Sequence, residues 1–146
     1  MYDDNAENRP LLMMIFGGTG DLTHRKLLPA LYHLSADGRL PRETSVVCIG
    51  RRPMDDEGYR ERARASISAY ARTGVDGEHL DSFLRKVHYR QMEFIGQPES
   101  YRELQDWLLC NESLYRAPAV RLFFLAVGPE HFGPIVGHLS AHRLVE

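Results

Sequence analysis

Cysteine is scarce in this sequence, which has only Cys48 and Cys110 among its 146 residues. The two stand far apart, and no metal-ligating residue types lie beside them at a useful spacing. Both occur in apolar stretches, VVCIG and WLLCN, so we expect two buried thiols in a protein of the reducing cytoplasm. Neither flanks a base, which argues against thiol catalysis. His138 and His142 have an i, i+4 spacing that can bind a metal, but they lack a third ligand, and we expect no metal site.

An excess of charge of one sign is also missing. The net charge is −2 at pH 7, which gives no electrostatic reason to expect a nucleic acid or a membrane surface as partner. No apolar run approaches the roughly 18 residues of a membrane span. The polar, acidic opening MYDDNAENRP is unlike a signal peptide. We therefore expect a cytoplasmic chain with a frayed tail at residues 1–10 and one folded domain at residues 11–146.

Apolar runs alternate with helical patterns along the chain. Runs with the length of strands occupy residues 11–16, 46–49, 87–92 and 119–127. Helical spacing of apolar residues occurs at residues 27–34 (closed by Gly38), 55–72, 79–85, 99–109 and 130–144. Along 55–72 the apolar residues Tyr59, Ala63, Ile67 and Tyr70 lie on one side of an amphipathic surface helix. This alternation predicts an α/β fold: a Rossmann-like, doubly wound parallel sheet, truncated at about four strands, with flanking helices.

Three glycines stand directly behind the first apolar run, in the stretch IFGGTGDLTHRKLLPALYHL. In a doubly wound domain, the loop after a strand lies where ligands bind, beyond the carboxyl ends of the strands. Glycines there allow a tight turn and the close approach of a phosphate, and the next helix offers N–H groups to that anion. A plain glycine turn remains the alternative, but the order strand, loop, helix favours a phosphate-binding loop. Pro29 fits either the start of a helix or a kink in a longer one.

The second apolar run ends in Gly50, Arg51 and Arg52, with no acidic residue before Asp55. An Asp or Glu at this place usually holds the ribose 2′-hydroxyl of NAD, whereas a guanidinium suits the dianionic 2′-phosphate of NADP. We expect Arg51 to favour NADP over NAD by about ten- to a hundredfold. The alternative is that the two arginines are solvated turn residues.

The stretch FGGTGDLTHRKLLPALYHL resembles the opening signature of the glucose-6-phosphate dehydrogenase family, with its Gly-x-x-Gly-Asp-Leu loop, basic run and proline before an apolar helix. VVCIGRR resembles the family's second strand, and LFFLAVGPEHFGPI resembles its apolar strand running into Ala-x-Pro-Pro, with Gly128 in place of the first proline. The resemblance runs over nearly the whole chain from Leu11. It implies the NADP-binding domain of an oxidoreductase of glucose metabolism.

The resemblance also implies roles for individual residues. Residues 17–22 would surround the pyrophosphate, Arg51 would hold the 2′-phosphate, and Lys26 would lie near the nicotinamide and the sugar phosphate. Residues 126–128 would line the nicotinamide, and residues 93–94 would lie close to the adenine, with Glu where the family has Asp. The cofactor-binding residues implied in this way are Gly17, Gly18, Thr19, Gly20, Asp21, Leu22, Arg51, Glu93, Phe94, Ala126, Val127 and Gly128.

Two segments that carry the family's sugar-phosphate contacts and its histidine base have no counterpart in the sequence. They are the Glu-Lys-Pro strand and the Arg-Ile-Asp-His-Tyr-Leu-Gly-Lys-Glu segment. His24 is the only histidine near the expected nucleotide, and we expect no catalytic residue here. We therefore expect the substrate domain to be absent from this chain, which would act on glucose 6-phosphate only when that domain is supplied. The reaction would then be oxidation at C1 to the 6-phosphogluconolactone, in the pentose phosphate pathway.

Two other interpretations stay open. One is a stand-alone nucleotide-binding or regulatory module without catalysis. The other is a short reductase-like protein with a GGTG loop, against which the lack of a Tyr-x-x-x-Lys pair argues. In any of them a sheet of this size has an uncovered edge, and we expect the strand at residues 119–127, whose pattern is the strongest of the four, to lie there. We therefore expect self-association through that edge.

Overall fold

A computed structural model describes residues 9–95, 97–110 and 120–144. Its centre is a four-stranded sheet in which every neighbouring pair is parallel and the strand order is β3-β2-β1-β4. The strands are β1 (Leu11–Phe16), β2 (Thr44–Gly50), β3 (Val87–Gln91) and β4 (Val120–Leu125). The chain order reverses between β1 and β4, because β1 is followed by β2 on one side while β4 is added on the other. The predicted parallel sheet is confirmed.

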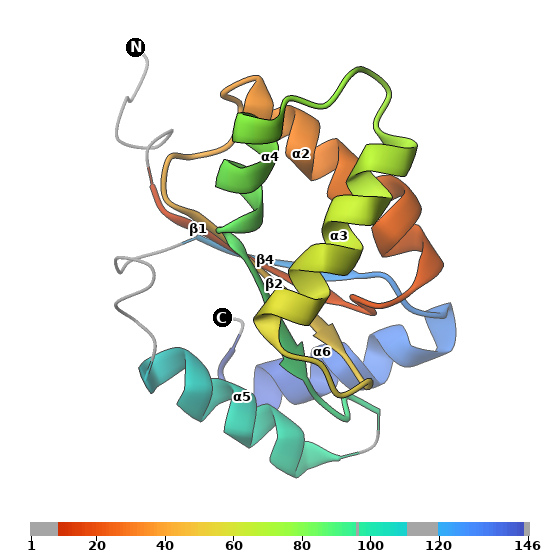
Figure 1. The fold of residues 1–146 in the computed structure, drawn as a ribbon. Coiled ribbons are helices and arrows are strands. Elements are labelled where there is room, and N and C mark those ends of the chain that lie inside the picture. Colours follow the sequence, from red (N-terminus) through yellow and green to blue (C-terminus); the bar gives the residue numbers. More distant parts are fainter. Residues whose placement is uncertain (1–8, 96, 111–119, 145–146) are drawn as a thin grey trace.

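Helices cover both faces of the sheet (Figure 1). On one face lie α2 (Leu28–Ala36), α3 (Asp56–Tyr70) and α4 (Gly77–Leu84). On the other lie α5 (Pro98–Cys110) and α6 (Phe132–Ala141). Two separate clusters of buried apolar side chains fill the space between each helix layer and the sheet. This is the doubly wound arrangement that the alternating pattern predicts.

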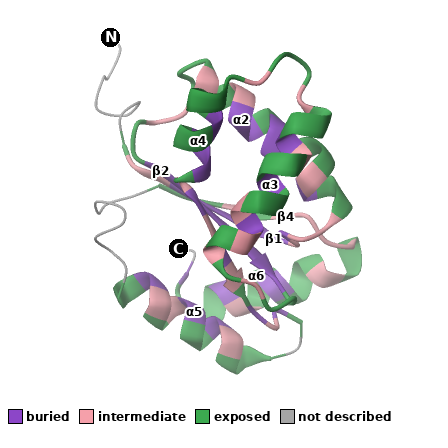
Figure 2. Cartoon of the chain, viewed as in Figure 1, coloured by how far each residue is buried: buried purple, intermediate pink, exposed green. Residues whose placement is uncertain are grey.

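The central strands are buried on both faces, as their continuous apolar runs indicate. Successive residues of β1 point to opposite clusters: Ile15 packs with the α3 layer, and Phe16 packs with the α5 layer. All seven residues of β2 are buried. In Figure 2 these strands are purple, while green covers the outward faces of the helices.

The edge strand β4 is different, because one of its faces is open. In its parallel register Leu122 stands opposite Met13 and Phe124 stands opposite Ile15. These side chains therefore lie on the face of the sheet that α2, α3 and α4 cover over the other strands. They are not covered themselves: Leu122 is 46% exposed and Phe124 is 38% exposed. Val120, on the same face, is 42% exposed. The structure thus confirms that this strand lies at an edge of the described sheet.

Short polar and glycine signals set the ends of the helices. The Asp55 carboxylate accepts a 2.7 Å hydrogen bond from the Gly58 N–H and caps α3. The Asp76 carboxylate caps α4 in the same manner. Gly38 follows α2 with a left-handed φ of +69°, as a helix C-terminus often requires.

The helix after the glycine loop contains a wide turn. Helical backbone begins at Asp21 and continues to Ala36, with a π-helical turn at Thr23–Leu27. There the Leu28 N–H donates to the Thr23 carbonyl, five residues back. Pro29 follows at once; a proline has no N–H and its ring displaces the carbonyl four residues earlier, so a wider turn suits this place. Pro29 is expected either at the start of a helix or at a kink in a longer one, and the structure supports a distorted turn within a longer helix.

Three predictions from the sequence need correction. Cys110 is exposed, because it lies on the far side of α5 from the buried Leu104 and Leu108. Tyr70 does not share the buried stripe of α3; it ends the helix and is 46% exposed. Residues 130–144 form a 3₁₀ turn at Pro129–His131 followed by α6, which ends at Ala141. Residues 1–8 of the tail expected at residues 1–10, and Ala119 at the start of the 119–127 strand, lie outside the described residues.

Candidate functional site

The loop after β1 is a tight turn fastened to the end of β2. The N–H groups of Gly17 and Gly18 both donate to the Ile49 carbonyl, at 2.9 and 2.8 Å. The Gly17 carbonyl in turn accepts from the Gly20 N–H at 3.0 Å and from the Thr23 hydroxyl at 2.9 Å. The helix that begins at Asp21 therefore starts at the carboxyl end of β1, where its first N–H groups have no partner within the helix.

Each glycine of the loop is needed for a different reason. Gly17 has a φ of +88°, and a Cβ there would overlap the Ala126 carbonyl oxygen. A Cβ on Gly18 would lie 2.7 Å from Cβ of Cys48. Backbone packing thus explains these two glycines without any ligand. Gly20 is the least crowded, with its nearest contact at 3.2 Å, and it lines an open pocket, so it is the glycine that best fits the approach of a phosphate.

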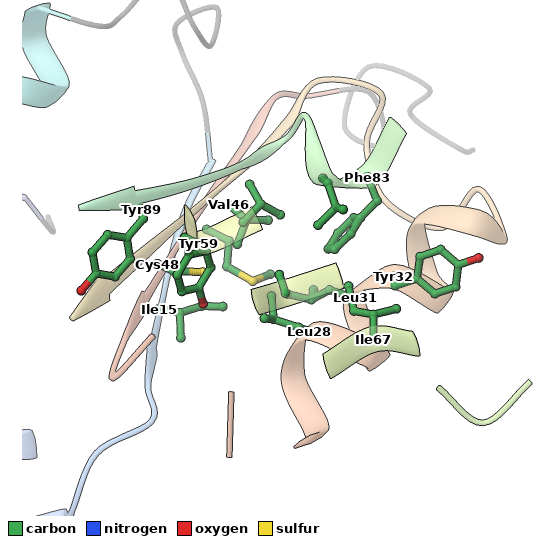
Figure 3. Packing of buried hydrophobic residues seen from close by; sticks show 14 of the residues in the cluster. Ile15, Leu28, Leu31, Tyr32, Val46, Cys48, Tyr59, Ile67, Phe83 and Tyr89 are labelled. Carbon is green, nitrogen blue, oxygen red and sulfur yellow. The ribbon is translucent and has the colours of Figure 1, made fainter. Parts of the chain in front are cut away.

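Two stacked tyrosines hold the loops after β1 and β2 side by side. The buried Tyr59 hydroxyl of α3 donates to the Gly18 carbonyl, and the Tyr89 hydroxyl of β3 donates to the Arg52 carbonyl at 2.6 Å. The two rings are stacked with centroids 5.0 Å apart, next to Cys48 (Figure 3). Burial raises the pKa of Tyr59, so its hydroxyl stays a donor. The sequence places Tyr59 on the buried side of its helix but does not reveal this contact.

The thiol of Cys48 is inert in this setting. Burial raises the pKa of Cys48 to about 12, so the thiolate is not formed near neutral pH. This supports the prediction that Cys48 is a structural thiol. The prediction of a buried thiol fails only for Cys110.

The side chains of Arg51 and Arg52 contact different parts of the molecule. Arg51 Nε lies 3.1 and 3.2 Å from the two carboxylate oxygens of Glu93, and the exposed fractions of these side chains are 58% and 44%. A surface ion pair of this kind contributes little, about 0–1 kcal/mol, so it does not commit Arg51 to Glu93. Arg52 instead lines a pocket beside the glycine loop.

That pocket has a volume of about 320 Å³ and lies between the glycine loop, the turn that follows it, the end of β2 and α3. The volume is within the range of roughly 300–1,000 Å³ that is common for ligand sites. Hydroxyls and guanidinium groups dominate its wall. The lining residues are Thr19, Gly20, Asp21, His24, Arg25, Arg52, Arg62, Ser66 and Tyr70.

His24 lies in the wall of this pocket and is half-buried. Its Nδ1 is 2.8 Å from the Ser66 hydroxyl, which itself donates to the Arg62 carbonyl at 3.0 Å. The serine oxygen therefore accepts from His24 Nδ1–H, which leaves Nε2 as the nitrogen without a partner. Burial and, next, the positive charge of Arg62 lower the pKa of His24, while the Gly18 carbonyl and Asp21 act weakly in the opposite direction.

This lowered pKa predicts a pH dependence of stability. The unfolded histidine titrates near its ordinary value of 6.5 and the folded one at lower pH, so the unfolded chain binds more protons in between. The stability that neutral His24 contributes is complete above pH 6.5 and is lost as the pH falls toward the folded-state pKa. Urea unfolding from about pH 7.5 to about pH 5.5 measures the loss. We expect it to be smaller in His24→Gln; an identical loss in both proteins would contradict the assignment.

The other residues implied by the resemblance lie around the same end of the sheet. Ala126 follows β4, donates its N–H to the Phe16 carbonyl at 2.8 Å and contacts Gly17, so the loop of residues 126–128 adjoins the glycine loop. Lys26 and Leu22 are exposed. The side chain of Phe94 is buried against Phe16, with ring centroids 5.8 Å apart, and only its backbone remains for a ligand.

Two further kinds of site do not occur in the described part of the chain. No three His, Cys, Asp or Glu side chains gather there as metal ligands would. His142 Nδ1 bonds instead to the His138 carbonyl at 2.9 Å, and both rings stack near Tyr101. Among the same described residues, every helix is too short or too polar to cross a bilayer.

The fold and the loops at the carboxyl ends of the strands define the class of this protein. A parallel, doubly wound sheet with a glycine loop at the point where the strand order reverses is a nucleotide-binding α/β domain of the Rossmann kind. The family model for glucose-6-phosphate dehydrogenase, NAD binding domain, matches residues 14–146. The chain belongs to this family, as the resemblance of its glycine loop predicts.

Individual relatives agree with this assignment. Glucose-6-phosphate 1-dehydrogenase of Chlamydia muridarum is 38% identical over 138 residues, which are 92% of this chain and 27% of the relative. That of Bacillus subtilis is 38% identical over 130 residues, which are 89% of this chain and 25% of the relative. The chain thus spans about a quarter of the length of the curated relatives it matches.

Solved structures show the same fold. A glucose-6-phosphate dehydrogenase in complex with its substrate glucose-6-phosphate matches with a TM-score of 0.82 at 26% identity, over 95% of this chain and 28% of the other. Glucose-6-phosphate 1-dehydrogenase from Mycobacterium avium matches with a TM-score of 0.78 at 27% identity, over 94% of this chain and 28% of the other. Both likenesses cover nearly all of this chain.

Proposed function

We propose that this chain is the NADP-binding domain of a cytoplasmic glucose-6-phosphate 1-dehydrogenase. The observation that carries the proposal is the arrangement at the carboxyl ends of β1 and β2. There a glycine loop that starts a helix is fastened directly beside two consecutive arginines. An anion at this place meets N–H groups, the positive end of a helix and guanidinium groups together.

The residues of the chain fit such a cofactor. The N–H groups of Gly17, Gly18 and Gly20 are bonded within the turn, so residues 17–22 would hold the pyrophosphate through the N–H groups of Thr19, Asp21 and Leu22, with Gly20 leaving room for its approach. Arg51 would bind the 2′-phosphate, giving up its exposed pair with Glu93. Ala126, Val127 and Gly128 would flank the nicotinamide, Glu93 and the backbone of Phe94 would adjoin the adenine, and Lys26 would reach the nicotinamide and the sugar phosphate. When bound, the nicotinamide supplies the hydride acceptor.

The activity of the whole enzyme needs more than this domain. We propose that the reaction is oxidation of glucose 6-phosphate at C1 to 6-phosphogluconolactone, in the pentose phosphate pathway. A base must be aligned with the C1 hydroxyl while the hydride leaves. His24 is engaged with Ser66 on α3, and among the described residues no other histidine lines the pocket. The base and the sugar contacts therefore belong to the part of the relatives that this chain does not match.

Calorimetric titration of the chain with NADP⁺ and, separately, with NAD⁺ tests this proposal. We expect both to bind, with NADP⁺ about ten- to a hundredfold tighter, because the guanidinium groups at the end of β2 meet an additional dianion. Arg51→Ala should reduce that preference. Arg102→Ala, which removes an exposed arginine of α5 far along the chain, is the matched control. A folded chain that binds neither nucleotide would overturn the proposal.

A further inference from the structure

The outer edge of β3 is covered by charged side chains of α3. β3 lies at one end of the described sheet and β4 at the other. An edge strand presents unpaired N–H and C=O groups, to which a strand of another chain can bind. On β3, side chains already occupy two of these groups. The Asp56 carboxylate accepts from the Tyr89 N–H at 2.8 Å, and Arg60 Nε donates to the Val87 carbonyl at 2.8 Å.

The register of β3 shows that these two backbone groups face away from the sheet. The carbonyl of Lys86, directly before β3, accepts from the Val46 N–H of β2 at 2.8 Å and therefore faces inward. In a parallel ladder, successive residues direct their backbone groups to opposite edges of the strand. Val87 and Tyr89 therefore face outward. An added strand would need the Val87 carbonyl and the Tyr89 N–H, and both are taken.

The two side chains of α3 are held in place by each other and by a histidine of β3. Asp56 and Arg60 are one helical turn apart, and Arg60 Nη2 lies 3.9 Å from Asp56 Oδ2. His88 Nδ1 lies 3.3 Å from the same oxygen, and because a carboxylate only accepts, Nδ1–H donates to it. Hydrogen bonds to charged groups are stronger than neutral ones. A strand that approached β3 would have to break this network before it could pair.

The rest of the sheet and helix shows that this arrangement is particular to β3. Arg64, one turn beyond Arg60 on α3, pairs with Asp81 of α4 at 2.6 Å and not with a strand. At the opposite edge of the sheet, β4 presents the exposed apolar side chains of Leu122 and Phe124. The two edges of the described sheet therefore differ: charged side chains block one, and the other is apolar and open on one face.

We propose that Asp56 and Arg60 close the outer edge of β3, so that a second copy of this chain can pair with the sheet only through β4. Pairing of β4 with β4 uses the same edge of both copies and ends at a dimer. Two open edges on each copy would instead allow head-to-tail pairing of β3 with β4, which does not close and grows into chains. This inference concerns association alone and does not depend on the binding of a nucleotide.

The test compares the double variant Asp56→Ala/Arg60→Ala with the matched control Glu57→Ala/Arg64→Ala. The control removes the same two charges from the same helix, and within the described part of the chain neither of its residues bonds to a strand. Sedimentation over a range of concentrations measures the size of the assemblies, and urea unfolding verifies that both variants are folded. We expect the first variant to exceed the weight-average mass of the unmodified chain by about twofold or more and to grow with concentration. The control should match the unmodified chain.

Amide hydrogen exchange provides a local readout in dilute solution, where copies do not pair. The Tyr89 N–H belongs to an edge strand but is bonded to Asp56, so it should exchange slowly in the unmodified chain and in the control. We expect its exchange to be about tenfold faster or more in Asp56→Ala, because that bond is lost. Equal exchange in the two variants would show that Asp56 does not cover the edge.

Adding Leu122→Lys distinguishes the two edges. A lysine on β4 hinders pairing there, so the triple variant Asp56→Ala/Arg60→Ala/Leu122→Lys should stop at a dimer through β3. If the folded double variant is no larger than the unmodified chain, or if the control grows equally, the inference is wrong. It is also wrong if the unmodified chain itself grows beyond a dimer, because β3 would then be open. None of these outcomes bears on the proposed function, which the nucleotide titration tests separately.

Discussion

Replacing Gly17 with alanine is expected to lower the free energy of unfolding by about 2–5 kcal/mol, from a left-handed backbone penalty together with overpacking. Two independent costs combine at this position. The φ of +88° is unfavourable for any residue with a Cβ, and that Cβ would overlap the Ala126 carbonyl oxygen behind β4. Ala126 directly follows β4, so the chain can relieve this clash only by moving β4 away from β1. Such a movement is possible because β4 is at the edge of the sheet. Urea unfolding followed by circular dichroism measures the loss.

Two other glycines separate these costs. Gly38 has a φ of +69°, and no atom lies within 4 Å of the place that a Cβ would take, so Gly38→Ala carries the backbone cost alone. Gly18 has no left-handed φ, but its Cβ would lie 2.7 Å from Cβ of Cys48, so Gly18→Ala carries the steric cost alone. We expect the loss in Gly17→Ala to exceed that in Gly38→Ala. Equal losses in Gly17→Ala and Gly38→Ala would show that β4 moves away from the new Cβ at no cost in stability, and would contradict the prediction.

The second large effect is expected on self-association, through the open face of β4. Val120, Leu122 and Phe124 present an apolar row on a strand whose outer edge has no neighbour in the described sheet. Such edges pair with other chains, and a lysine on them prevents the pairing. We predict that the chain self-associates through β4 and that Leu122→Lys weakens the association at least tenfold, or about 1.4 kcal/mol. Sedimentation equilibrium over a range of concentrations measures it.

A second exposed leucine provides the control for this experiment. Leu109 of α5 is 56% exposed, even more than Leu122, but it stands on a helix and offers no strand edge. Leu109→Lys makes the same chemical change and is expected to leave the association within about twofold, since isolated exposed apolar residues are common on protein surfaces. A monomeric unmodified chain at high concentration would contradict the prediction.

The sequence predicts the fold well because parallel strands that are buried on both faces consist of continuous apolar runs. The run at residues 11–16 coincides with β1, and the run at residues 46–49 lies inside β2. What it misses depends on the direction of single side chains. VVCIG and WLLCN look alike as apolar stretches, but Cys48 is on a strand buried on both faces and Cys110 is on the outer side of a helix.

The candidate site is predicted only in part, for a similar reason. The glycine loop and the two arginines are contiguous in the sequence, so their place at the carboxyl ends of β1 and β2 follows from the strand limits. The sequence does not reveal that Arg51 and Arg52 point to different sides, nor that α3 brings Arg62 and Ser66 to the loop. These contacts join segments far apart in the chain, and no local periodicity records them.

The stacked pair Tyr59 and Tyr89 has a consequence for the thermodynamics of binding. Fixing the backbone of one residue costs about 1–2 kcal/mol in conformational entropy. The two hydroxyls donate to the carbonyl groups of Gly18 and Arg52, so both loops lose their freedom when the chain folds, while the N–H groups of Asp21 and Leu22 at the start of the helix remain for a ligand. An arriving anion therefore meets a preorganised surface, and the entropy of loop ordering does not reduce its affinity.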